Sequence, residues 1–246
     1  MQDHGDNDGQ AEQEQPFYLT PPAPCPYLPD RMEQRILTFI EPAQAALSAP
    51  LLAAGFRRGP HMFYRPHCPT CNACMSVRMP VADFVPDKNF RRTLRRNDDI
   101  QTHITEAKSD EPLYALFHRY QNTRHTDGEM AAMSVADLKA MIEDQPGTAR
   151  LMHCTKDGQS IGVMLFDETD TSVSAIYSFF EPDQPKRSLG TYMVLKLVEY
   201  TQNTGRDYLY LGYWIRQSPK MAYKARFQPL QILIKNEWKD FKSISF

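Results

Sequence analysis

The chain has 246 residues, of which 41% are apolar and 24% charged, and a formal net charge of −2. These values are ordinary for a globular protein with a hydrophobic core, and the length allows one large or two modest domains. There is no run of about 18 apolar residues, and the polar, acidic N-terminus has no apolar signal region. The sequence therefore supports neither membrane insertion nor secretion, and we expect a cytoplasmic protein.

Residues 1–15 are predicted to form a disordered acidic tail. Their acidic side chains are Asp3, Asp6, Asp8, Glu12 and Glu14, and without them the rest of the chain carries about +3. A segment with so few apolar groups cannot offset the entropy lost on ordering. We assign this tail no function.

Order is predicted to begin at Phe17, in the proline-rich stretch FYLTPPAPCPYLPDR. Proline fixes its own φ and disfavours helix at the preceding residue, so this stretch is expected to run as an extended arm around Cys25. The elements expected next are a strand over residues 33–40, an alanine-rich helix over 42–54 and short strands over 61–65 and 75–79.

Three cysteines lie on one loop in the pattern Cys68-x2-Cys71-x2-Cys74, and the proline-rich arm supplies a fourth, Cys25. Four thiolates are the number that tetrahedral zinc or an iron–sulfur cluster requires. In a reducing cytoplasm a structural disulfide is the less expected use. Two interpretations stay open, a metal or cluster site and free thiols that only pack. Cys154 lies in an apolar strand and is expected to be buried.

A helix is predicted over residues 87–99, with Phe90 and Leu94 turned toward the body of the protein. Its arginines share one face, and they are Arg91, Arg92, Arg95 and Arg96. An arginine face is suited to nucleic-acid phosphates, because the guanidinium fork can bond phosphate through two N–H groups. The alternative is a solvated face that pairs with nearby acids such as Asp98 and Asp99.

The middle of the chain is predicted to be helical and then rich in strands. Ser109 is the expected cap of one helix, and Ser134 with Asp137 forms a capping box for the next. Between these helices lies a polar turn whose His125 is a candidate base, with a structural histidine as the alternative. Successive antiparallel strands are then expected over residues 150–155, 160–166 and 173–180.

The last of these strands leads to the segment Arg187-Ser188-Leu189-Gly190-Thr191, which is predicted to open a helix. Free N–H groups and the helix dipole favour an anion there, and Lys186 and Arg187 add full charges, so phosphate is the expected guest. The loop resembles the pyrophosphate-binding turn of GCN5-related N-acyltransferases (GNAT), which holds coenzyme A. Gly190 fits that turn, whereas Tyr192 replaces its second small residue. Acyl transfer to an amine thus stays open without coenzyme A.

This order of elements predicts an α+β protein. We expect a GNAT-like acyltransferase domain, with a mainly antiparallel sheet flanked by helices, and an N-terminal cysteine-containing α/β region. The predicted division is a tail over residues 1–15, an N-terminal region with the cysteines and the arginine helix over 16–108, and a catalytic domain over 109–246.

Six motifs together resemble one known family. In chain order they are FYLTPPAPCPYLPDR, GFRRGPHMFYRPHCPTCNAC, NFRRTLRRNDD, YQNTRHTDG, IYSFFEPDQPKRSLGTYM and YLGYWIRQSPKMAYKARFQP. They resemble the aminoacyl-tRNA–protein transferases, and the short chain is similar to the bacterial branch, the aspartate/glutamate leucyltransferases. The resemblance implies transfer of leucine from leucyl-tRNA to the α-amine of proteins that begin with Asp or Glu, which marks them for degradation by the N-end rule pathway.

Such a reaction needs cationic recognition of the acceptor, phosphate binding for tRNA and a donor to the developing oxyanion, but no covalent nucleophile. For the 3′ end of tRNA we select Arg187, Ser188, Gly190 and Thr191, and for its backbone Arg91, Arg92, Arg95 and Arg96. For the acceptor we select Lys220, Lys224 and Arg226. The catalytic candidates are Tyr177, Glu181, Asp183, Tyr213 and Tyr223, and the two carboxylates are expected either to orient or deprotonate the amine or simply to cap a helix.

The chemistry itself requires no cofactor. The N-terminal cysteines of eukaryotic relatives imply a redox-sensitive metal or cluster, so zinc or an iron–sulfur cluster is a further expectation at Cys25, Cys68, Cys71 and Cys74. Three alternatives remain: an arginyl-tRNA donor, an N-acetyltransferase that uses acetyl-coenzyme A, and a non-catalytic RNA-binding sensor built on the cysteine loop and the arginine face.

Overall fold

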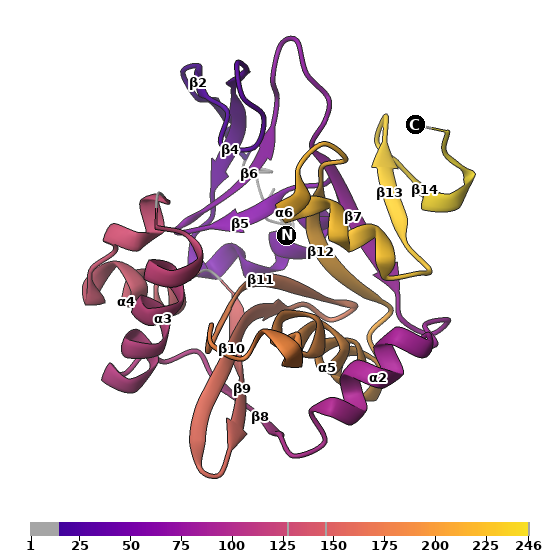
Figure 1. Ribbon diagram of the computed structural model, residues 1–246. Helices are drawn as coiled ribbons and strands as arrows, with labels where there is room; N and C mark the ends of the chain where they lie inside the picture. The colour runs from indigo at the N-terminus through magenta and orange to yellow at the C-terminus, as the bar shows by residue number, and fades with distance from the viewer. Residues whose placement is uncertain (1–14, 127, 146, 246) are drawn as a thin grey trace, which may run out of the picture.

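The computed structural model describes residues 15–126, 128–145 and 147–245. All of the predicted acidic tail except Gln15 therefore lies outside the described residues. The centre of the fold is an eight-stranded sheet (Figure 1). In spatial order its strands are β14 (Glu237–Asp240), β13 (Gln231–Ile234), β7 (Met75–Pro80), β12 (Tyr208–Trp214), β11 (Ser172–Phe180), β10 (Gln159–Glu168), β9 (Thr148–Lys156) and β8 (Gln101–Glu106). Only β11 and β12 are paired in parallel within this sheet.

Two smaller sheets come from the N-terminal part of the chain. The four-stranded sheet has the order β1 (Tyr18–Leu19), β4 (Arg35–Phe39), β6 (Met62–Pro66) and β5 (Arg57–Gly59), and the two-stranded sheet pairs β2 (Ala23–Pro24) with β3 (Met32–Glu33). The helices are α1 (Ser48–Ala53), α2 (Lys88–Arg96), α3 (Glu111–Arg124), α4 (Val135–Glu143), α5 (Leu189–Asn203) and α6 (Pro219–Ala222).

Helices cover both faces of the large sheet, and the side-chain alternation of its strands explains why. Val163 and Leu165 of β10 belong to the core under α3 and α4, whereas Met164 and Phe166 of the same strand belong to the core under α5 and α2. Neighbouring residues of a strand point to opposite faces, so a strand that is apolar throughout is buried on both sides. Figure 1 shows the two helix pairs on either side of the sheet.

The four-stranded sheet is attached to the large sheet by apolar and polar contacts. Phe56 and Phe63 share a buried cluster with Tyr210 of β12. Arg58 of β5 forms an ion pair with Asp167 of β10 at 2.5 Å, and the Arg58 side chain is only 1% exposed. Apolar burial and a buried charge pair therefore hold the two sheets together.

The predicted fold class is confirmed: the structure is a mixed α/β fold with a large, mostly antiparallel sheet and flanking helices. The capping box of Ser134 and Asp137 is confirmed at the start of α4. The predicted cap at Ser109 is wrong, because Asp110 accepts the hydrogen bond from Leu113 N, while Ser109 donates to Glu143. An aspartate one residue later satisfies the same free N–H groups with a charged oxygen.

Other predicted elements have different bounds in the structure, and some strands were not predicted. The predicted helix over residues 42–54 begins as a 3-10 helix, Pro42–Leu47, and becomes α-helical only at Ser48. The predicted arginine helix is shorter than expected, because Asp87 caps α2 and Asn97 ends it. Strands β5 and β8 were not predicted. Because β7 and β8 pair with strands from the C-terminal part, the large sheet spans the predicted boundary at residue 108, and that division stays a prediction.

The buried ion pair between the sheets gives a prediction for stability. Arg58→Ala should lower the free energy of unfolding by about 3–5 kcal/mol, since it leaves the Asp167 carboxylate without its partner in a buried place. Chemical denaturation measures the change. The matched control is Lys108→Ala, because Lys108 pairs with Glu106 in solvent, and its loss should cost less than about 1 kcal/mol. Equal effects of the two substitutions would contradict the role given to the Arg58 pair.

Candidate active site

Strands β11 and β12 separate in the middle of the large sheet. They pair only between residues 172–174 and 208–210, after which β11 continues to Phe180 and β12 to Trp214. We call residues 175–180 of β11 and 211–214 of β12 the strand fork. A bulge between Tyr210 and Gly212 bends β12 at this point. Backbone groups that lose their ladder partners must bond to side chains, water or a ligand, so a fork of this kind is a natural binding place.

Tyr177 lies on the β11 arm of the fork. Its phenol oxygen accepts a hydrogen bond from Gln121 Nε2 at 2.7 Å, and its ring packs against Phe117 and Phe179. Burial raises the pKa of Tyr177 to about 12. The phenol therefore stays protonated at neutral pH, and its own O–H can donate to a developing oxyanion.

Tyr213 lies on the β12 arm, and its hydroxyl is engaged by the N-terminal part of the chain. The oxygen is 3.2 Å from the carbonyl oxygen of Gly55 and 3.0 Å from that of Tyr64. Burial raises the pKa of Tyr213 well above its ordinary value. This hydroxyl thus joins the two larger sheets, and a direct part of Tyr213 in the reaction stays a prediction.

The segment after β12 carries the predicted acceptor-binding cations, and the structure gives them different surroundings. Lys220 is exposed in α6, and its charge adds to the effect of burial in lowering the pKa of His125. Lys224 is buried, and its Nζ donates to the carbonyl oxygen of Tyr213 at 2.7 Å. Arg226 lies over the ring of Phe90, 5.6 Å from its centroid, beside α2. The predicted catalytic Tyr223 is 43% exposed.

Lys224 has an unusual environment for a lysine. Burial, with a smaller contribution from the positive charge of Arg57, lowers its pKa to about 7. The charged form of a lysine is stabilised by water or by a neighbouring carboxylate, and among the described residues no carboxylate forms an ion pair with Lys224. Near neutral pH this side chain therefore exchanges between its charged and neutral forms.

The loop before α5 is tied to the end of α2. Arg187 binds Asp99 through two hydrogen bonds of 2.7 and 2.8 Å, and these bonds hold the pKa of Asp99 well below its ordinary range. Arg96 donates to the carbonyl oxygen of Lys186, and Asn97 donates to that of Arg187. The predicted tRNA-binding loop and the predicted arginine face are thus brought side by side, with Arg187 partly occupied by a protein carboxylate.

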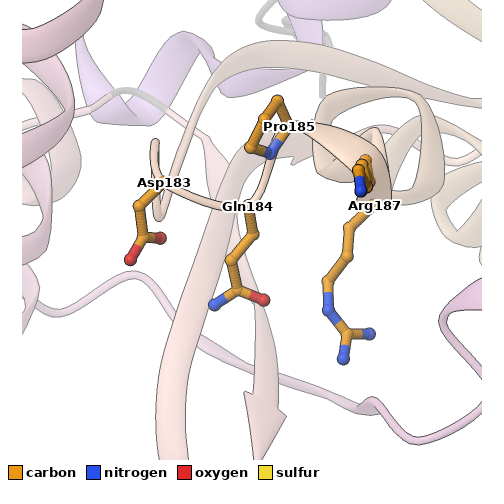
Figure 2. Close-up of a pocket in the computed structure, with 5 residues that line it drawn as sticks. Asp183, Gln184, Pro185 and Arg187 are labelled. Carbon is orange, nitrogen blue, oxygen red and sulfur yellow. The ribbon is translucent and has the colours of Figure 1, made fainter.

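The same loop lines a surface pocket (Figure 2). The side chains of Asp183, Gln184 and Arg187 point to the same side of it. Ser188 has a positive φ of 54° where the loop turns into α5, and a Cβ on Gly190 would lie 3.2 Å from the ring of Phe180. A small residue at position 190 therefore lets the first turn of α5, which includes Thr191, pack against the end of β11.

The two predicted catalytic carboxylates differ. Glu181 forms an ion pair with Arg119 of α3 at 2.5 Å, whereas Asp183 is exposed at the pocket of the loop. Neither side chain caps a helix. Their proposed role toward the amine stays a prediction.

The arginines of α2 form the predicted face. Arg91, Arg92, Arg95 and Arg96 are all exposed, while Phe90 is buried and Leu94 is half-buried. Arg91 donates to the carbonyl oxygen of Pro86. The side chains of this face are therefore directed outward, as the helical spacing predicts.

All four cysteines of the predicted metal site line one pocket, and each is half-buried. Burial, with a smaller effect of Cys25, Cys68 and Cys71, raises the pKa of Cys74 to about 12. Among the described residues, however, no three His, Cys, Asp or Glu side chains are arranged to hold a metal ion. The four thiols share one pocket, a metal or cluster there stays a prediction, and we derive no reaction step from it. Cys154 is fully buried, as expected.

The chain matches two parts of one protein family. The parts are described as "Arginine-tRNA-protein transferase, N terminus", over residues 23–92, and "Arginine-tRNA-protein transferase, C terminus", over residues 112–234. A relative from Gluconacetobacter diazotrophicus named "Aspartate/glutamate leucyltransferase" is 48% identical, over 90% of this chain and 86% of its own. Another of that name, from Parvibaculum lavamentivorans, is 44% identical, over 91% and 93% of the two chains.

This chain belongs to the aspartate/glutamate leucyltransferase family. It is accordingly an enzyme of the aminoacyltransferase class. A solved structure with a similar fold is the C-terminal domain of a protein described as a lysylphosphatidylglycerol synthetase, from Agrobacterium fabrum. It has a TM-score of 0.53 at 11% identity and covers 86% of this chain and 82% of its own. Within the described residues no helix is both long and apolar enough to cross a bilayer.

The structure adds side chains to the site that the sequence did not single out. Arg57 reaches the fork from β5, Gln121 reaches it from α3, and Tyr120 packs against Phe180 at the end of β11. The only signal for Arg57 in the sequence is its place in the motif GFRRGPHMFYRPHCPTCNAC, where it is one of two adjacent arginines. Nothing local distinguishes an arginine that enters a core from one that faces solvent.

The low pKa of Lys224 gives a pH prediction. Its folded pKa of about 7 lies below the ordinary value of 10.5, so the unfolded chain binds more protons between these two pH values. Relative to Lys224→Met, the wild-type protein should therefore gain stability as pH rises from 7 toward 10, by up to about 1.4 kcal/mol per pH unit.

Urea unfolding of both proteins at several pH values measures this difference. Titrations common to both proteins cancel in the comparison. A difference in unfolding free energy that stays constant across this range would show that Lys224 titrates normally.

Proposed function

We propose that the protein transfers leucine from leucyl-tRNA to the α-amine of proteins that begin with Asp or Glu. The observation that carries this proposal is the similarity to relatives named aspartate/glutamate leucyltransferase, at 40–48% identity over about nine-tenths of this chain. The new N-terminal leucine would mark the acceptor for N-end rule degradation. We place the reaction in the cytoplasm, where charged tRNA is available.

The reaction needs alignment more than strong base catalysis. The leucyl ester is already activated, and an α-amine has a pKa near 8, so part of it is neutral at cellular pH. The neutral nitrogen attacks the ester carbonyl, the C–N amide bond forms, and the ester C–O bond breaks. The tRNA 3′ oxygen leaves as a hydroxyl, with a proton that originates on the amine.

The fork supplies groups suited to this chemistry. Tyr177 has a protonated phenol, held in place by Gln121, and it is the candidate donor to the oxyanion of the tetrahedral intermediate. Lys224, with a pKa near 7, is able to carry charge or to accept a proton. Lys220, near His125, remains the exposed cation for the acceptor chain.

The cationic surface formed by α2 and the loop before α5 is the proposed contact for tRNA. Arg91, Arg92 and Arg95 project outward from α2, and Arg96 joins α2 to the loop at Lys186. Arginines on a helix face suit the spaced phosphates of a nucleic acid. Arg187, Ser188, Gly190 and Thr191 are the proposed contacts for the 3′ end, and binding there would compete with Asp99 for the Arg187 guanidinium.

A transfer assay tests the reaction. Labelled leucyl-tRNA is incubated with matched peptides that begin with Asp, Glu or Ala, and arginyl-tRNA serves as the rival donor. We expect transfer of leucine to the Asp and Glu peptides and none to the Ala peptide. Preference for arginyl-tRNA would keep the reaction class and overturn the donor, while no transfer from either donor would overturn the proposed function.

The metal predicted at the cysteine pocket has a separate test. Protein purified without oxygen should contain close to one zinc ion or one iron–sulfur cluster per chain, and Cys68→Ser with Cys71→Ser should remove it. Elemental analysis and the absorption spectrum measure the content, with Cys154→Ser as the matched control because Cys154 lies outside the pocket. Absence of both metals from the wild-type protein would reject the prediction.

A further inference from the structure

Two basic side chains bond to the backbone where the strand fork opens. Arg57 Nη2 donates to the carbonyl oxygen of Ala175 at 2.6 Å, the first β11 residue beyond the paired stretch. On the other arm, Lys224 Nζ donates to the carbonyl oxygen of Tyr213 at 2.7 Å. Each arm of the fork therefore has a carbonyl that accepts a hydrogen bond from a basic side chain instead of from the neighbouring strand.

Arg57 is fixed in this position by the shape of β12. Gly212 has a φ of 82°, and a Cβ at this residue would lie 2.7 Å from Arg57 Cζ. The guanidinium thus occupies the space that any other residue at position 212 would fill. Only glycine adopts this backbone conformation readily, and its lack of a Cβ leaves room for the guanidinium. Gly212 therefore helps to hold the Arg57 side chain in the fork.

The Arg57 guanidinium is not fully bonded. Its Nη1 is buried and has no hydrogen-bond partner among the described residues. An unpaired buried N–H group is costly, and more so on a charged group. The next residue, Arg58, is buried and has Asp167 as its counter-ion. In the described part of the chain neither Arg57 nor Lys224 forms an ion pair with a carboxylate.

The fork consequently has an excess of positive charge. Repulsion by the positive charge of Arg57 is one of the causes of the lowered pKa of Lys224. Within residues 15–126, 128–145 and 147–245, the other titratable groups found to interact with this pair are tyrosines and a thiol, namely Tyr27, Tyr213, Tyr223 and Cys74. These groups are neutral at neutral pH, so none of them balances the two cations. A ligand with a carboxylate would supply both the missing charge and the missing acceptor.

We propose that Arg57, together with Lys224, binds the side-chain carboxylate of the acceptor's first residue in the strand fork, and that Arg57 determines the preference for Asp and Glu. The inference rests on the proposed function and identifies the group that reads the acceptor. Tyr177 stands on the same arm as Ala175, two residues further along and beyond a bulge in β11, and its ring packs on the α3 side of the sheet whereas Ala175 packs on the α5 side. The carbonyl group that Arg57 binds and the candidate oxyanion donor therefore lie on one arm of the fork, so an acceptor held by Arg57 would lie beside Tyr177.

The charge of the ligand explains the discrimination. An acceptor that begins with Asn or Gln has nearly the same shape but carries no charge. It would leave the charge of Arg57 without a counter-charge beside its buried Nη1, which is the kind of mismatch that lets a site reject a close analogue strongly.

The experiment compares peptides that begin with Asp and with Asn at saturating leucyl-tRNA. The quantity measured is the ratio of kcat/KM for the two peptides, for the wild-type protein, Arg57→Gln and Arg57→Lys. Arg57→Gln should reduce the ratio by about 10- to 100-fold, the loss expected for a hydrogen bond to a charged group. Arg57→Lys keeps the charge without the fork of donors and should reduce it less.

Arg65→Gln is the matched control. Arg65 lies in the same four-stranded sheet, and its Nη1 donates to the carbonyl oxygen of Ala54 at 2.8 Å, so it bonds to the backbone as Arg57 does, but at a residue outside both arms of the strand fork. The ratio should not change in this variant. Thermal unfolding of each variant shows whether it is folded.

The outcomes separate this inference from the proposed function. If the wild-type protein transfers leucine to the Asp peptide and folded Arg57→Gln keeps the wild-type ratio, the inference is wrong and the function stands. If the wild-type protein transfers leucine to neither peptide, the function fails first. If Arg57→Gln does not fold, Arg57→Lys decides, because an unchanged ratio and an unchanged KM for the Asp peptide in that variant would also overturn the inference.

Discussion

The contact between Arg57 and the carbonyl oxygen of Ala175 is the interaction on which the arrangement of the site depends. Two neighbouring strands of a sheet cannot separate unless something else bonds to the groups that lose their partners. Here the bulge at Gly212 bends β12, and Arg57 and Lys224 take over the free carbonyls of the two arms. Because side chains with positive charge take the place of the neighbouring strand as hydrogen-bond donors, positive charge lies inside the sheet. The proposed recognition of a substrate carboxylate depends on this charge.

The N-terminal four-stranded sheet contributes to the candidate site because it supplies this arginine. Its adjacent residues have distinct tasks: Arg58 is neutralised by Asp167, while Arg57 enters the fork without a counter-ion. Tyr213 reinforces the junction through the carbonyl oxygens of Gly55 and Tyr64. Contacts of this kind fix one sheet against the other, so a cation borne by the smaller sheet is held at a defined place in the larger one.

At the start of α5, in contrast to the strand fork, the arginine has a carboxylate partner. Asp99 neutralises Arg187 and also pairs with Lys156, which attaches the loop to the end of α2 and to β9. The outward-facing arginines of α2 are not engaged in ion pairs with carboxylates in the described part of the chain. The Arg187 guanidinium of the loop is therefore paired with a carboxylate, whereas the arginines of α2 are exposed to solvent.

The sequence by itself determined the elements whose signals are local. The alternation of β9, β10 and β11, the capping box at Ser134 and the outward arginine face of α2 follow from residues close together in the chain. The family also followed from the order of its motifs. Tertiary structure decided the surroundings of each basic side chain. Lys224 is buried, Arg187 is paired with Asp99, which is 88 positions away in the chain, and Arg57 bonds to Ala175, which is 118 positions away. Burial and charge balance depend on contacts between segments that only folding brings together, and for this reason local patterns do not reveal them.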